Sequence, residues 1–118
     1  MKKSIILVSA FILVLIISAC GSVVKYTKEF SYLPSYPGMV LENSSPANEY
    51  GFSTASYSIA DAKIEDIITE YEKLLHKNGW KTTDDKKPSS ITVEKEKHLA
   101  VIVPSQNMKD TTVFIISK

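Results

Sequence analysis

The most regular apolar pattern in the chain runs from about Asp61 to Asn78. Isoleucine, tyrosine and leucine recur there every three or four residues, at positions 64, 67, 68, 71, 74 and 75. This spacing is typical of an α-helix with one apolar face. We therefore predict an amphipathic helix over about 61–78, with Asp61 as the N-cap and Gly79 ending it.

Shorter segments around this helix are rich in β-branched and aromatic residues, which favour strands. Residues 42–49 and 84–88 are polar and predict a loop and a turn, and Pro104 is expected to end a strand. The predicted fold class is α+β, an antiparallel sheet of about four to five strands with the helix packed on one face. Its candidate strands are residues 50–59, 80–83, 90–94, 99–103 and 111–117, and residues 39–41 are a further, short candidate.

The hairpin after the helix has two possible registers. A three-residue loop at Lys95–Lys97 pairs Val93 with Leu99 and Ile91 with Val101, and gathers these apolar side chains on one face. A two-residue loop mixes the two faces. We therefore predict the three-residue loop.

The longest apolar run lies at the start of the chain. Two lysines precede residues 4–24, which carry no charge, and small residues surround Cys20. A charged start, an apolar middle and a small-residue end are the parts of a secretory signal peptide. Two alternatives stay open, namely a helix retained in the bilayer and an ordinary secretory peptide that leaves Cys20 as a free thiol.

The segment Ile17-Ser18-Ala19-Cys20 resembles the lipobox of bacterial lipoproteins. The resemblance implies cleavage between Ala19 and Cys20, an S-diacylglyceryl group on the thiol and an N-acyl group, such as palmitate, on the new amino terminus. It also implies that the lipid bilayer is a partner through acylated Cys20. The folded domain would then lie on the extracytoplasmic side of the cell membrane.

Composition narrows the remaining function classes. Removal of residues 1–19 leaves 99 residues, enough for one small domain, which we divide into a lipidated cysteine and tether (20–35) and an α+β domain (36–118). All basic residues are lysines, and twelve of them then face thirteen carboxylates. Without arginine or a basic excess, nucleic-acid binding is disfavoured. The single cysteine excludes an intramolecular disulfide partner.

A second resemblance covers about residues 36–117. The chain has Tyr36-Pro37-Gly38, a helix with Tyr71 and Leu75, and Gly79-Trp80 before a run of strands. This order is similar to a pattern in small uncharacterised bacterial lipoproteins. The resemblance implies a packing arrangement and no activity.

Catalytic motifs are absent from the sequence. There is no Gly-rich phosphate loop, serine elbow or zincin motif. His76 follows Glu72 by four residues, a spacing that suits a metal or a surface pair, and we favour the surface pair and predict no metal and no cofactor. His98 is expected in a solvated hairpin loop. A small anchored hydrolase using His76, Glu72 and Glu65 is kept as a second alternative.

Four aromatic residues lie within eleven positions of the expected tether: Tyr26, Phe30, Tyr32 and Tyr36. They are candidate contacts for a small apolar or sugar ligand, which is the first alternative function. The favoured interpretation is a membrane-anchored envelope lipoprotein of unknown biochemical activity. In this view the domain is a non-catalytic binding or structural module, with an unidentified envelope protein or cell-wall component as partner.

Overall fold

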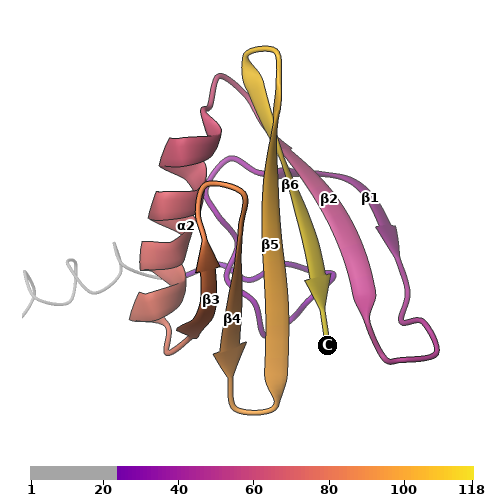
Figure 1. Cartoon of the computed structure of the whole chain (residues 1–118). Helices are drawn as coiled ribbons and strands as arrows, with labels where there is room; N and C mark the ends of the chain where they lie inside the picture. The colour runs from indigo at the N-terminus through magenta and orange to yellow at the C-terminus, as the bar shows by residue number, and fades with distance from the viewer. Residues whose placement is uncertain (1–23) are drawn as a thin grey trace, which may run out of the picture.

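The computed structural model describes residues 24–118, so Cys20 and its apolar run lie outside the described residues. Within residues 24–118, six antiparallel strands form one sheet and one helix packs on it (Figure 1). The predicted α+β class is confirmed, whereas the predicted number of four to five strands is wrong. The elements are β1 (Val40–Ser45), β2 (Ser53–Ile59), α2 (Ile64–Lys77), β3 (Lys81–Lys86), β4 (Ser90–Lys95), β5 (His98–Asn107) and β6 (Asp110–Ser117).

The strand order is β1-β2-β6-β5-β4-β3, which makes β1 and β3 the two edges and places the last strand, β6, inside the sheet. All six side chains of β1 and five of the six in β3 are exposed. An edge strand is held by backbone hydrogen bonds on one side and need not bury side chains. For that reason the polar residues 42–45 and 84–86, predicted as loop and turn, belong to strands.

The turn between β4 and β5 contains two residues, so the predicted three-residue loop is wrong. Glu96 adopts a left-handed conformation (φ 56°) that suits a tight hairpin turn. Val93 is paired with Ala100 and Ile91 with Ile102, and all four are buried. β5 carries apolar residues on both faces of the sheet, so its sequence pattern fits either register. Leu99, Val101 and Val103 alternate with the buried residues and face the opposite side of the sheet.

β5 continues to Asn107, beyond the end predicted at Pro104. The printed pairing of β5 with β4 stops at Ile102, while its pairing with β6 goes on to Asn107. A proline beyond that point therefore costs no hydrogen bond to β4. The extension carries the β5–β6 hairpin up to the start of α2 (Figure 1).

The helix α2 begins at Ile64, and the predicted N-cap at Asp61 is wrong. Asp61 has a left-handed backbone (φ 51°) and lies in the turn before the helix. Lys63 occupies the N-cap position without a side-chain hydrogen bond. Instead Gln106 of the hairpin accepts a hydrogen bond from the Ile64 amide (3.2 Å) and donates one to the Ala62 carbonyl (3.0 Å). A distant strand thus supplies the cap.

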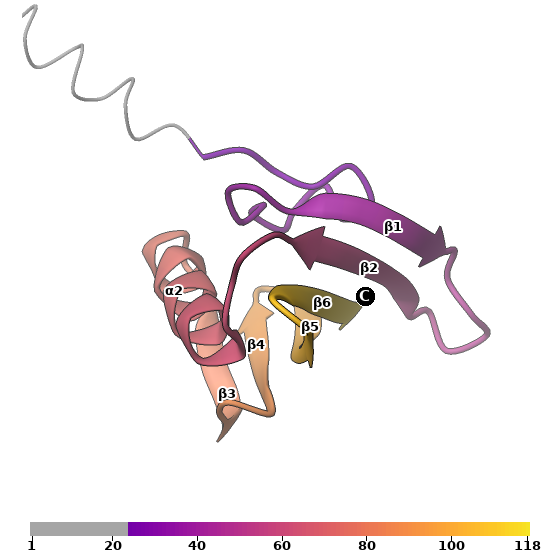
Figure 2. The ribbon, with the colours of Figure 1, turned by 90° about the horizontal axis from the view of Figure 1, so that it is seen from above.

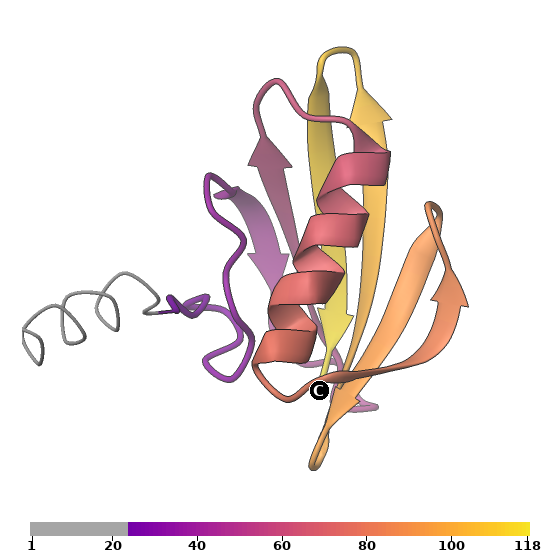
Figure 3. The ribbon, with the colours of Figure 1, turned by 90° about the vertical axis from the view of Figure 1, so that its left-hand side faces the viewer.

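One face of the sheet is covered by α2 and by the N-terminal segment, residues 24–39 (Figures 2 and 3). The predicted stripe of α2 is buried at Ile67, Ile68, Tyr71 and Leu75. The N-terminal segment continues this cover towards β2 and β6. There the Tyr57 hydroxyl donates to Glu29 (2.6 Å), and the hydroxyls of Tyr32 and Ser117 are hydrogen-bonded (2.8 Å).

The N-terminal segment contributes to the core itself. Phe30 and Leu33 are buried among side chains of the helix and sheet. The Thr27 hydroxyl closes the turn from Thr27 to Phe30, since it donates to the Phe30 carbonyl (2.7 Å) and accepts from the Phe30 amide (2.9 Å). The packed domain therefore extends into residues 20–35, which the sequence analysis assigned to a tether.

This packing predicts a stability effect for Leu33→Ala. Removing a fully buried leucine side chain should lower the free energy of unfolding by about 2–5 kcal/mol. Chemical denaturation followed by Trp80 fluorescence measures it. The control Val40→Ala, at a position 65 % exposed on β1, should stay within about 0.5 kcal/mol of the parent. Equal effects of the two substitutions would show that the N-terminal segment unfolds separately from the sheet.

Candidate functional site

A group of interacting polar side chains joins α2 to the edge strand β3 and the turn that follows it. We call it the Glu72 cluster, and it consists of Glu72, His76, Thr82, Asp85 and Lys87. The predicted pair of His76 and Glu72 is present, with His76 Nε2 3.8 Å from Glu72 Oε2. The Glu72 carboxylate is largely buried, whereas the His76 side chain is 49 % exposed, so only the histidine of this pair is solvated as the sequence suggested.

Every oxygen of the Glu72 carboxylate has a donor. The Thr82 hydroxyl donates to Oε2 at 2.6 Å, and Lys87 Nζ donates to Oε1. Lys87 also donates to Asp85 Oδ2 at 2.9 Å. Sequence reasoning missed Thr82 and Lys87, because both come from a segment predicted as a short strand and turn. The one available signal was the presence of a lysine in the polar turn that follows the first strand after the helix.

The protonation state of Glu72 follows from these contacts. Burial raises the pKa of this carboxyl, but the hydrogen bonds from Lys87 and Thr82 and the charges of Lys87 and His76 outweigh it. The net result is a pKa below the ordinary value of 4.5. Glu72 is therefore a carboxylate at neutral pH and does not hold a proton for general-acid catalysis.

Thr82 is not arranged as a nucleophile. Its single hydroxyl proton is directed at Glu72, while its oxygen lies 2.8 Å from His76 Nε2. The imidazole must therefore donate at Nε2, and so it has no lone pair there to accept the threonine proton. The cluster uses its polar groups to hold α2 against β3.

Glu65, the third residue of the hydrolase alternative, lies elsewhere. It is eleven positions before His76 on α2, a separation of about 16 Å along a helix axis. Glu65 lines a separate hollow of about 440 Å³ together with Met108 of the β5–β6 hairpin. The structure therefore does not bring His76, Glu72 and Glu65 together. Among residues 24–118, no three metal-ligating side chains gather in one place either.

The four aromatic candidates do not form one surface. Phe30 belongs to the core, whereas Tyr26 is 48 % exposed. Tyr32 stacks on His98, with ring centroids 3.6 Å apart and planes 10° from parallel, so His98 is not a free loop histidine. Tyr36 donates a hydrogen bond to Glu70 (2.6 Å), and burial together with this carboxylate raises its pKa to about 12.

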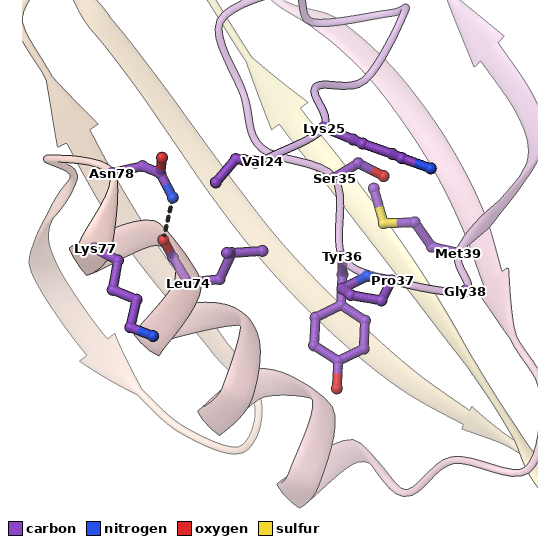
Figure 4. A pocket seen from close by; sticks show the side chains of 10 residues that line it. All are labelled: Val24, Lys25, Ser35, Tyr36, Pro37, Gly38, Met39, Leu74, Lys77 and Asn78. Atoms are coloured by element: carbon purple, nitrogen blue, oxygen red, sulfur yellow. Dashed lines mark hydrogen bonds between the residues drawn. The ribbon is translucent and has the colours of Figure 1, made fainter. Parts of the chain in front are cut away.

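Tyr36 does line a hollow in the part of the chain that the structure describes. This open groove, of about 1060 Å³, separates the C-terminal half of α2 from the N-terminal segment (Figure 4). We call it the α2 groove. Leu74 and Lys77 line it from the helix, and Val24, Lys25 and Tyr36 line it from the N-terminal segment.

Comparisons with known proteins found no matching family model, no matching curated protein and no matching solved structure.

A search of residues 24–118 for a helix with the length and apolar character needed to cross a bilayer found none.

The Glu72 cluster predicts how stability depends on pH. Since the folded state lowers the pKa of Glu72, its ionised form stabilises the fold above pH 4.5, and this contribution is lost as the pH falls through the folded-state value. Glu72→Gln should therefore cost about 1–3 kcal/mol at pH 7. The difference from the parent should shrink below pH 4.5.

Urea denaturation at neutral and acidic pH measures this difference. The matched control is Asp84→Asn, because Asp84 pairs with Lys86 at 3.6 Å on the exposed surface of β3. That substitution should change stability by less than about 1 kcal/mol at either pH. A Glu72→Gln difference that stays constant with pH would contradict the assignment of an ionised Glu72.

Proposed function

We propose that the chain is a membrane-anchored bacterial envelope lipoprotein whose folded domain is a non-catalytic binding or structural module. The observation that carries this proposal is the position of the single cysteine. Cys20 directly follows Ile17-Ser18-Ala19 at the end of an uncharged apolar run. Cleavage before Cys20 and its S- and N-acylation would leave the domain on the extracytoplasmic face of the cell membrane.

The packing of the N-terminal segment supports this anchor. Thr27 is already buried in the domain, only seven residues after Cys20. A diacylglyceryl group supplies two acyl chains, enough for stable attachment, whereas one chain would bind only marginally. The domain would therefore be held close to the bilayer surface by a short connection.

The hydrogen bonds within the Glu72 cluster support the non-catalytic part of the proposal. Nucleophilic catalysis needs a hydroxyl or thiol whose proton a neighbouring base can take. In the cluster the Thr82 proton goes to a carboxylate that also pairs with Lys87, and His76 acts as a donor. These contacts favour a role in stabilising the domain over the alternative of a hydrolase.

Intact mass of the chain purified from bacterial membranes tests the anchor. We expect the loss of residues 1–19 and the added mass of a diacylglyceryl group on Cys20. In Cys20→Ser, the precursor should accumulate uncleaved and membrane-bound, because the hydroxyl cannot take the lipid. The control Ser22→Ala, just outside the lipobox, should be processed like the parent.

Two other outcomes would reject the lipoprotein assignment. Release of a mature water-soluble domain from Cys20→Ser would favour an ordinary signal peptide. An unprocessed, unlipidated parent chain of 118 residues would favour a retained apolar helix.

A further inference from the structure

We propose that the α2 groove faces the membrane and binds the phosphate headgroups of anionic phospholipids through Lys25 and Lys77. This inference rests on the proposed function, because it requires lipid attachment at Cys20. It adds an orientation for the domain and names a ligand class for the groove.

The lining of the groove combines apolar surface with two amino groups. Val24, Met39 and Leu74 supply apolar side chains, and Lys25 and Lys77 lie on opposite sides of the hollow (Figure 4). A bilayer interface offers the matching pattern, since anionic phosphates lie directly above the acyl chains. Lysine is a suitable partner for such a surface, because its long apolar stem can lie along hydrocarbon while its charge stays among headgroups.

The charges of the two lysines are available for this contact. Within residues 24–118, no carboxylate lies within 4.0 Å of either amino group. By contrast, Lys87 is engaged by Glu72 and Asp85. Among the described residues, the lining of the groove contains these two lysines and no carboxylate, so the lining itself carries net positive charge. Glu70 lies outside the lining and keeps its negative charge while it accepts the hydrogen bond of Tyr36.

The covalent chain limits how far the groove can lie from the membrane. Val24 lies four positions after Cys20, and four extended steps of the chain span at most about 14 Å. Attraction to anionic lipid decays within about 8 Å at physiological ionic strength. Val24 lines the α2 groove and does not line the hollow beside Met108. That hollow lies at the opposite end of α2, which is about 21 Å long.

The test uses the full lipidated chain reconstituted into phosphatidylcholine vesicles with and without phosphatidylglycerol. A nitroxide is attached to a cysteine introduced in the groove by Ser35→Cys, or by Pro37→Cys if the first variant folds poorly. The reference position is Met108→Cys, which is 92 % exposed at the β5–β6 hairpin. Collisions with a water-soluble nickel chelate report the accessibility of each label.

The groove label should be protected from the chelate in phosphatidylglycerol vesicles, while the label at position 108 stays accessible. Lys25→Gln combined with Lys77→Gln should reduce the docked population about fivefold per lysine. The matched control is Lys63→Gln with Lys109→Gln, which removes two exposed charges at the other end of α2 and should leave the protection unchanged.

Three results would overturn the proposal or its basis. Equal accessibility at positions 35 and 108 would show that the groove does not face the bilayer. Protection that persists in pure phosphatidylcholine and in the lysine variants would show that the groove holds an apolar chain instead of headgroups. A mass without lipid on Cys20, measured on the same sample, would reject the proposed function itself, so the two failures are distinguishable.

Discussion

The fold depends on Tyr71, which joins the helix to the N-terminal segment inside the core. Its ring is fully buried, its hydroxyl donates to the Pro34 carbonyl at 2.6 Å, and the ring of Tyr36 meets it edge-on at 5.9 Å. Burial raises the pKa of this phenol far above its ordinary value, so the hydroxyl remains a donor at all physiological pH values. Through this contact α2 and residues 24–39 together cover one face of the sheet. The α2 groove lies between these two parts of the covering layer.

Charged and polar side chains protect the exposed edge strand β3 from pairing with other molecules. Unpaired edge strands can recruit strands from other molecules, and charged side chains discourage such pairing. The edge strand β3 carries Lys81, Asp84 and Lys86 in exposed positions. The Glu72 cluster then ties this strand to α2. His76 and Glu72, which the sequence offered as candidates for a hydrolase site, thus belong to a cluster that holds the edge strand β3 in place.

Sequence patterns were sufficient for the parts of the fold that bury apolar side chains at a regular period. The stripe of α2 follows directly from spacing, and the central strands follow from segments rich in β-branched and aromatic residues. The polar edge strands carry no such signal, and the β4–β5 register depends on a turn conformation at Glu96. The helix start depends on Gln106, forty-two residues away from Ile64. Likewise, the burial of Glu72 depends on Thr82 and Lys87, whose proximity no local pattern encodes.

The place of β6 in the sheet has a consequence for the order in which the fold is completed. β6 follows the other five strands in sequence, yet it lies between β2 and β5 and connects the β1–β2 pair to the β5–β4–β3 group. The two parts of the sheet cannot be joined until β6 itself is available for pairing. A chain synthesised from its N-terminus therefore remains without its complete sheet until residues 110–117 have been released.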